Sequence, residues 1–130
     1  MAVKTEIWVK AHLRRCFAQG LTGVVARRGA AEAGTVFIKV TLPEGRAKVL
    51  GPAPGPVYDE LGRRTWAAPL GSQPVSLDEA DRFLSRQAAI DPDIWVIDID
   101  DANGTGLIEL EADHPNRTGS DVPGGGSGSF

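Results

Sequence analysis

The stretch Gly34–Thr41 reads GTVFIKVT and is the densest run of β-branched and aromatic residues in the chain. Side chains alternate between the two faces of a strand, so one face here is uniformly aliphatic, with Val36, Ile38 and Val40. The other face is mixed because it carries Phe37 and Lys39. We expect a central antiparallel strand, with the rest of the fold built around it. If a helix covers Phe37, Lys39 is expected to escape at an edge of the sheet.

Short connections join this strand to neighbouring strand candidates. Pro43–Gly45 is typical of a tight turn, and Ala47–Leu50 is predicted to return as the next strand. Thr22–Arg27 is predicted to be a short strand before the central one, and Arg63–Ala67 is a candidate strand after it. Gly51–Pro56 holds three prolines and two glycines, so we expect an irregular loop there.

Two segments have the apolar period of amphipathic helices. The first is Glu6–Gln19, which follows Thr5, a residue whose hydroxyl is expected to cap the helix. Its apolar face is predicted to comprise Val9, Leu13, Cys16 and Phe17. The second is Ser76–Ala89, in which Ser76 and Glu79 stand three apart as a capping box. We expect both helices to pack against the sheet.

The chain order is therefore predicted as α-β-β-β-β-α-β, with Ile94–Asp100 as the last strand. A turn at Asn103-Gly104 follows, and Leu107–Leu110 is a candidate for pairing back onto that strand. We predict a single small α+β domain over residues 1–112, with a mainly antiparallel sheet of about five strands and two helices. Residues 113–130 are polar and rich in Gly and Ser, and we predict a disordered tail there.

The composition is that of a globular protein, with 42% hydrophobic and 24% charged residues in 130. One cysteine excludes an internal disulfide framework and favours a reducing compartment, so we expect a cytoplasmic protein. No apolar run approaches the ~18 residues of a membrane span. The net charge of −3 is unevenly distributed: residues 1–65 have eleven Lys or Arg and five Asp or Glu, and residues 66–130 have three and twelve. Either the halves neutralise each other, or a basic face meets an anionic partner.

The sequence contains no catalytic signature. Asp98, Asp100 and Asp101 resemble a site for a hard cation, which several oxygen ligands would hold, but they also suit the solvated face of a hairpin. His12 and His114 form no recognisable pair for acid–base chemistry. Cys16 lies on the apolar face of the first helix and is predicted to be a small core residue. We expect no cofactor, and we lean toward a protein without enzymatic activity.

Basic and aromatic residues define a candidate interaction surface. Its members are Trp8, Lys10, Arg14, Arg15, Arg27, Arg28 and Tyr58. The basic members form one face if the first helix packs beside the first strand, and Tyr58 follows the proline-rich loop. Phosphate binding needs such a cluster, although the acidic composition differs from that of typical nucleic-acid-binding domains.

Six segments, in order, resemble a known family. They are Lys4–Val9 (KTEIWV), Leu13–Arg15 (LRR), Ala26–Gly29 (ARRG), Glu32–Val36 (EAGTV), Gly51–Pro54 (GPAP) and Asp91–Val96 (DPDIWV). From about Lys4 to Asp101 the chain is similar to the alphaproteobacterial family catalogued as domain of unknown function 1491. This resemblance implies a small, single-domain bacterial protein of the cytoplasm with no assigned activity, and it carries over no catalytic residue.

Three functions follow as hypotheses. The first is a non-enzymatic protein-interaction or adaptor module. The second is nucleic-acid binding through a basic face formed by Arg14, Arg15, Arg27 and Arg28. The third is a metal-dependent enzyme that uses the Asp98, Asp100 and Asp101 cluster. Homo-oligomerisation through an exposed edge strand is compatible with all three.

Overall fold

The computed structural model describes residues 3–108. The elements in chain order are α1 (Thr5–Ala18), β1 (Thr22–Arg27), β2 (Val36–Leu42), β3 (Arg46–Pro52), β4 (Trp66–Ala67), β5 (Val75–Ser76), α2 (Leu77–Ile90) and β6 (Trp95–Asp100). The α+β class is confirmed, and the predicted order holds apart from the additional two-residue strand β5. The predicted domain boundary at residue 112 and the predicted tail lie outside the described residues.

The sheet has the strand order β1-β6-β2-β3-β4, and β5 pairs with β3. Strand β2 is central, as predicted, and most strand pairs are antiparallel. The expectation that β2 is antiparallel to its neighbours is wrong for β6, which runs parallel to it. The reason is geometric. Strands β1 and β2 run in opposite directions and β6 lies between them, so β6 must be parallel to one of the two.

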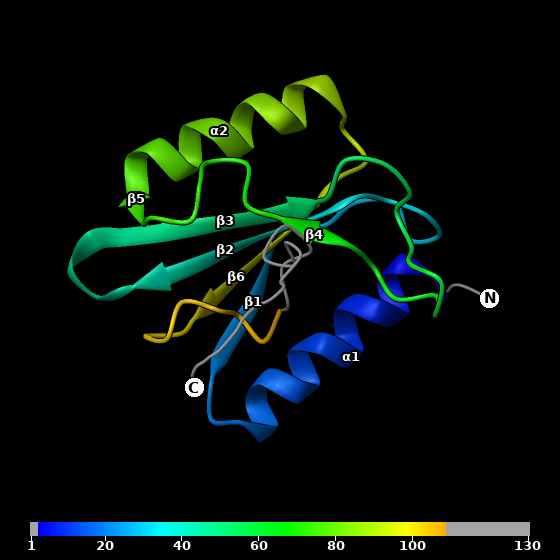
Figure 1. Ribbon diagram of the computed structural model, residues 1–130, viewed down its shortest axis with the longest axis horizontal. Helices are drawn as coiled ribbons and strands as arrows, with labels where there is room; N and C mark the ends of the chain where they lie inside the picture. The colour runs from blue at the N-terminus through cyan, green and yellow to red at the C-terminus, as the bar shows by residue number, and fades with distance from the viewer. Residues whose placement is uncertain (1–2, 109–130) are drawn as a thin grey trace, which may run out of the picture.

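The two helices cover opposite faces of the sheet (Figure 1). On one face, α1 packs against the aliphatic side of β2 and against Trp95, Ile97 and Ile99 of β6. On the other face, Ala80 and Leu84 of α2 pack against Phe37, Val49 and Val96. Both faces of the central strands are therefore buried. This is why β2 carries apolar residues on both of its faces, while the face that meets α1 is entirely aliphatic.

Helix α1 begins differently from the prediction. Thr5 is its first residue and does not cap it; the Thr5 hydroxyl donates to the carbonyl oxygen of Gly34 at 3.0 Å. The loop before β2 satisfies the helix terminus instead, because the backbone N–H groups of Thr5 and Glu6 donate to the carbonyls of Glu32 and Ala31. The start of α1 is thus fastened to a segment that is almost thirty residues away in the sequence.

The buried face of α1 also differs from the prediction at two positions. Val9 and Cys16 are buried as expected, but Phe17 is 60% exposed. His12 is fully buried, and it lies between Val9 and Cys16 on the inward side of the helix. Phe17 therefore lies on the exposed side of the last turn of α1, whereas the His12 ring bonds to the carbonyl of Gly106 and is enclosed by the loop after β6.

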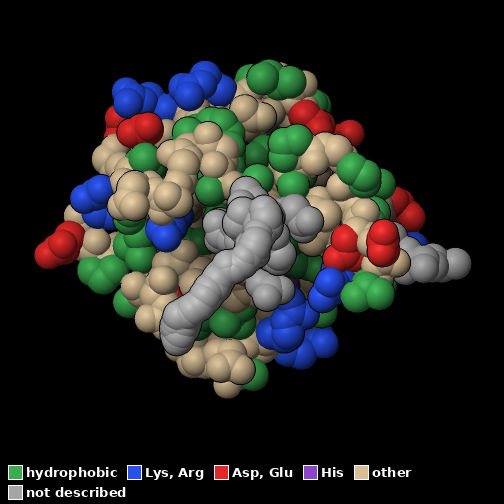
Figure 2. Space-filling model, in the orientation of Figure 1, with side chains coloured by type: hydrophobic (Ala, Val, Ile, Leu, Met, Phe, Trp, Pro, Cys, Tyr) green, Lys and Arg blue, Asp and Glu red, His purple; other side chains and the backbone are tan. Residues whose placement is uncertain are grey.

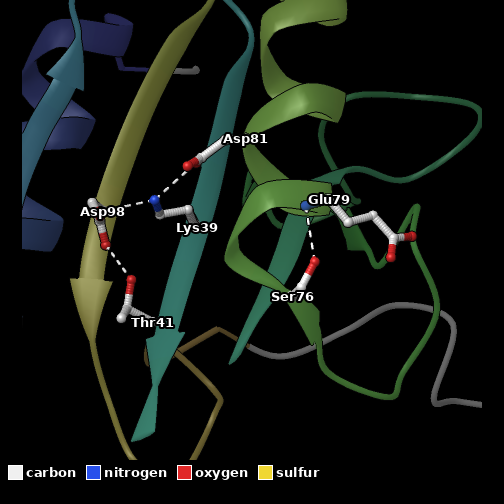
Figure 3. Close-up of polar contacts among 6 residues, drawn as sticks. All are labelled: Lys39, Thr41, Ser76, Glu79, Asp81 and Asp98. Atoms are coloured by element: carbon white, nitrogen blue, oxygen red, sulfur yellow. Dashed lines mark hydrogen bonds and ion pairs between the residues drawn. The ribbon is translucent and has the colours of Figure 1, made fainter. Parts of the chain in front are cut away.

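Helix α2 does cover Phe37, whose ring meets the Phe83 ring edge to face with 5.9 Å between centroids. We had expected Lys39 to reach solvent at an edge of the sheet in this case, and that expectation is wrong. Its side chain is 16% exposed, and its ammonium group pairs with Asp81 of α2 at 2.9 Å and with Asp98 of β6 at 3.4 Å (Figure 3). Two carboxylates therefore accommodate a cation under the helix, in the middle of the sheet.

The capping box of α2 is present in part. The Ser76 hydroxyl accepts a hydrogen bond from the backbone N–H of Glu79 at 3.1 Å, as Figure 3 also shows. The acidic first turn, with Asp78 and Glu79, suits the positive end of the helix dipole. Local sequence alone thus accounts for the start of this helix.

Two loop predictions need correction. Gly51 and Pro52 are not irregular but end β3, where they pair with Ala67 and Trp66. Gly51 is required there because a Cβ atom at this position would lie 2.6 Å from the Phe37 ring. Leu107 and Ile108 form a turn rather than a returning strand, and the other half of that predicted strand, residues 109–110, lies outside the described residues.

Candidate functional site

A cavity of about 380 Å³ lies where α1 meets the loop between β3 and β4. Aromatic and arginine side chains dominate its wall: Trp8, Arg15, Tyr58, Arg63, Arg64 and Trp66. We call it the arginine–aromatic cavity. Three of these residues, Trp8, Arg15 and Tyr58, belong to the predicted interaction surface. The structure brings them together although Tyr58 is more than forty residues from the other two.

Arg64 occupies the centre of this arrangement. Its guanidinium group lies 5.5 Å from the centroid of the Trp8 ring and 5.6 Å from that of the Tyr58 ring, within the range of cation–π attraction. One terminal nitrogen donates to the Thr5 hydroxyl at 2.7 Å. That hydroxyl donates onward to Gly34, so it is oriented to accept from Arg64. The guanidinium is therefore held in place by α1 and by the loops that precede β2 and β4.

The charge of Arg64 is incompletely compensated. Its side chain is half-buried, and no acidic side chain within residues 3–108 forms an ion pair with it. Its Nε atom is buried without a hydrogen-bond partner in the same range. Burial lowers the pKa of the Arg64 guanidinium, and Tyr58 opposes this shift. Arginine nevertheless stays protonated in proteins, so the site holds a partly desolvated cation.

Two further guanidinium groups line the cavity. Arg15 donates to Nδ1 of His12 at 2.6 Å, and Arg63 donates through Nε to Asp59 at 3.0 Å. The backbone N–H of Arg63 lowers the pKa of Asp59 most strongly, and bonds from Leu61 and the Arg63 side chain add to it, so Asp59 is ionised at neutral pH. Three guanidiniums and one carboxylate thus give the lining a formal charge of +2.

A polar network centred on buried His12 packs against the Trp8 ring. The His12 ring stacks on Trp8 with 4.8 Å between centroids. Because Nδ1 accepts from Arg15, Nε2 carries the proton and donates to the carbonyl of Gly106 at 2.8 Å. Burial lowers the pKa of His12, the bond to Gly106 opposes that shift, and Arg15 adds to it, so His12 is neutral. It fixes the position of Trp8 and Arg15 and does not reach solvent.

The remaining predicted surface residues lie elsewhere. Lys10 and Arg28 both pair with Glu6, and Arg28 also lies 5.2 Å from the centroid of the Trp95 ring. Arg27 donates to the carbonyl of Pro92 and lines a separate cavity beside α2, with Lys39 and Asp81. Arg14 is exposed on α1.

Figure 2 shows Lys and Arg side chains over α1 and a second group over α2. The four arginines Arg14, Arg15, Arg27 and Arg28 therefore do not converge on one site.

Sequence reasoning missed Arg63, Arg64 and Trp66 as members of the site. A signal was present, because the basic pair follows Gly62 and precedes Thr65 and Trp66, a few residues after Tyr58. We had interpreted this segment only as a strand. Arg64 forms an isolated β-bridge with Tyr58 just before β4, and its side chain contacts Thr5 and Trp8; no local pattern reveals those contacts.

The three aspartates of the metal hypothesis have separate roles. Asp98 pairs with Lys39 and accepts from the Thr41 hydroxyl at 2.7 Å (Figure 3). Asp101 is 4% exposed and accepts bonds from the backbone of Asn103, Thr105 and Gly106. Burial alone would raise the pKa of Asp101, but these bonds lower it. Asp100 is exposed. Within residues 3–108, no three His, Cys, Asp or Glu side chains are placed to hold a metal ion.

Comparison with known proteins agrees with this description of the fold. The model of a family described as "Protein of unknown function (DUF1491)" matches residues 3–109. The chain belongs to this family. A crystal structure of a DUF1491 family protein from Caulobacter crescentus is 35% identical, with a TM-score of 0.69 over 85% of this chain and 97% of that one. An NMR structure of a DUF1491 family protein from the same organism is 38% identical, with a TM-score of 0.66 over 85% and 96% of the chains.

A further structural relative extends the family to a second genus. The solution structure of a protein from A. tumefaciens is 32% identical to this chain, with a TM-score of 0.72 over 85% of this chain and 96% of that one. No curated protein matches this DUF1491 chain. None of the helices described here is long and apolar enough to cross a membrane.

Proposed function

We propose that this DUF1491 protein is a non-enzymatic adaptor of the bacterial cytoplasm that binds another protein through the arginine–aromatic cavity. The observation that carries the proposal is Arg64, a half-buried cation stacked on Trp8 and Tyr58 and without an acidic partner among residues 3–108. A partly desolvated charge costs folding free energy unless something compensates it. An anionic group on a partner would supply that compensation.

The chemistry of the chain supports binding rather than catalysis. His12 and Cys16 are the side chains of residues 3–108 best suited to act as a general base and a nucleophile, and both are fully buried. Burial raises the pKa of the Cys16 thiol, Arg15 opposes that shift and Asp101 adds to it, which disfavours the reactive thiolate. Arginine and aromatic residues, by contrast, are the types that dominate binding energy at protein interfaces.

An affinity-capture experiment tests the proposal. The full-length protein is immobilised and exposed to lysate of its source organism at low and moderate salt, with and without nuclease. The test variant is R15Q/R63Q, which alters two exposed cavity arginines. The control is R82Q/R86Q, which makes the same charge change on α2, where both arginines are exposed.

We expect a protein that the wild type and R82Q/R86Q retain and that R15Q/R63Q releases, with or without nuclease. Identical retained sets for all three proteins would refute a role for the cavity. Retention that nuclease abolishes, and that weakens steeply with salt, would instead favour the nucleic-acid hypothesis.

A further inference from the structure

We propose that the group recognised in the arginine–aromatic cavity is a phosphate monoester carried by the partner protein. This inference rests on the proposed function and specifies its chemistry. It depends on three observations: how the three guanidiniums are anchored, what charge the cavity carries, and which faces of its aromatic rings are already occupied.

Each guanidinium donates one side-chain hydrogen bond within the protein and keeps further donors for a ligand. Arg15 is held by His12, Arg63 by Asp59 and Arg64 by Thr5. A guanidinium has five N–H donors in a rigid fork, so one anchoring bond leaves donors on all three groups. Anchored arginines lose little further side-chain freedom on binding, which favours affinity. Clusters of this kind recognise phosphorylated side chains in several classes of binding domain.

The charge of the cavity distinguishes phosphate from carboxylate. The lining carries three guanidiniums and one ionised carboxylate, a formal charge of +2. A phosphorylated side chain carries about −1.5 to −2 charges at neutral pH and three acceptor oxygens. One carboxylate carries a single charge and two oxygens, so it would leave one guanidinium uncompensated. A tetrahedral dianion therefore matches the cavity better in charge and in number of acceptors.

The aromatic rings favour a phosphorylated protein over a nucleotide. The Trp8 ring already contacts His12, Arg64 and Trp66, with centroid distances of 4.8 Å to His12 and 5.5 Å to Trp66. Tyr58 already contacts Arg64. These contacts hold Arg64 in position, and they occupy ring surface on which a base would have to stack. The cavity thus offers strong recognition of the phosphate group and little for a nucleobase.

Indole signals provide a direct test on the full-length protein. Trp8 and Trp66 line the cavity, whereas the Trp95 indole N–H donates to the carbonyl of Ala30 outside it. The three indole N–H resonances are followed by NMR during titration with inorganic phosphate, O-phosphoserine, AMP and acetate at constant ionic strength. We expect phosphate and O-phosphoserine to shift Trp8 and Trp66, to leave Trp95 in place and to bind more tightly than acetate.

Variants separate specific recognition from a general charge effect. R15Q and R63Q each remove a charge-assisted, forked contact, and R64K keeps the charge but removes the fork. Each should weaken phosphate binding about tenfold or more. The exposed variant R86Q should bind as the wild type does. R15Q and R63Q alter exposed side chains, so they test the idea even if a change at Arg64 disturbs folding.

Three results would overturn the inference: acetate binding as tightly as phosphate, cavity variants binding phosphate normally, or AMP binding much more tightly than O-phosphoserine. Phosphatase treatment of the lysate separates this inference from the proposed function. Loss of the captured partner after treatment supports a phosphate monoester. A partner that still depends on Arg15 and Arg63 after treatment would leave the adaptor function intact and refute the phosphate.

Discussion

Removing the Lys39 ammonium should destabilise the fold, and removing its partner as well should restore most of the loss. Lys39 and Asp98 are 16% and 28% exposed, and their charged atoms are 3.4 Å apart. Burial alone would lower the pKa of Lys39, but Asp81 and Asp98 raise it. Charged Lys39 therefore stabilises the fold fully at pH values below its ordinary pKa of 10.5. This stabilisation is lost only as the pH rises through the higher pKa of the folded state. Lys39 is therefore charged at neutral pH.

The magnitude follows from the burial of each partner. Breaking a fully buried ion pair costs about 3–5 kcal/mol, and breaking an exposed one costs about 0.2–1 kcal/mol. The Lys39–Asp98 pair lies between these cases, so K39M should lower the free energy of unfolding by about 2 kcal/mol. Asp81 is 58% exposed, so D81N should cost less than about 1 kcal/mol. The double variant K39M/D98V removes both buried charges and leaves only Asp81, which is 58% exposed, without its Lys39 partner, so it should fall within about 1 kcal/mol of the wild type.

Urea denaturation followed by tryptophan fluorescence measures these differences, and thermal melting gives an independent value. For a domain of this size, K39M should lower the melting temperature by about 10 °C. The wild type, K39M, the single variant D98V and K39M/D98V form a double-mutant cycle, in which the coupling between Lys39 and Asp98 should be about 1–3 kcal/mol. A K39M protein as stable as the wild type would refute the reasoning. So would a double variant whose loss equals the sum of its two single losses.

Two further predictions concern a glycine and a histidine. G29A should lower the free energy of unfolding by about 3 kcal/mol, because a Cβ atom there would collide with the backbone at Asp93. Overpacking alone costs about 1–3 kcal/mol, and lost hydrogen bonds add to that cost. G45A, with open space around it but a φ of 71°, should cost only about 1 kcal/mol in urea denaturation, and equal losses would contradict the argument. The free energy of unfolding should also fall as the pH drops below 6.5, by up to about 1.4 kcal/mol per pH unit. The reason is that burial lowers the pKa of His12, so its imidazole binds a proton in the unfolded chain at pH values where it stays neutral in the folded protein. An NMR titration in which the His12 ring protonates at or above pH 6.5 would exclude this cause.

Local periodicity was sufficient for much of the fold. The alternation around Ile38 identified the central strand, and the spacing of Ser76 and Glu79 located the start of α2. Both signals lie within a few residues of the feature that they predict. They work because backbone geometry converts short-range spacing directly into a face or a cap.

The position of β6 could not be derived in this way. The chain leaves β3, crosses the sheet through α2 and inserts between two strands that are consecutive in sequence. No local pattern distinguishes this insertion from a strand added at an edge. The same long-range order explains Lys39, because Asp81 and Asp98 come from elements that only the final topology places beside it.

The sequence by itself determined both helices and the four longer strands, the α+β class and two aromatic positions of the site, Trp8 and Tyr58. Only the tertiary structure decided that Arg64 joins them, because its anchor at Thr5 is 59 residues away. It also decided that His12 is buried, because the ring donates to the carbonyl of Gly106, which is 94 residues away in the sequence. Secondary structure depends on neighbours in sequence, whereas a binding cavity depends on which distant segments the packing of both sheet faces brings into contact.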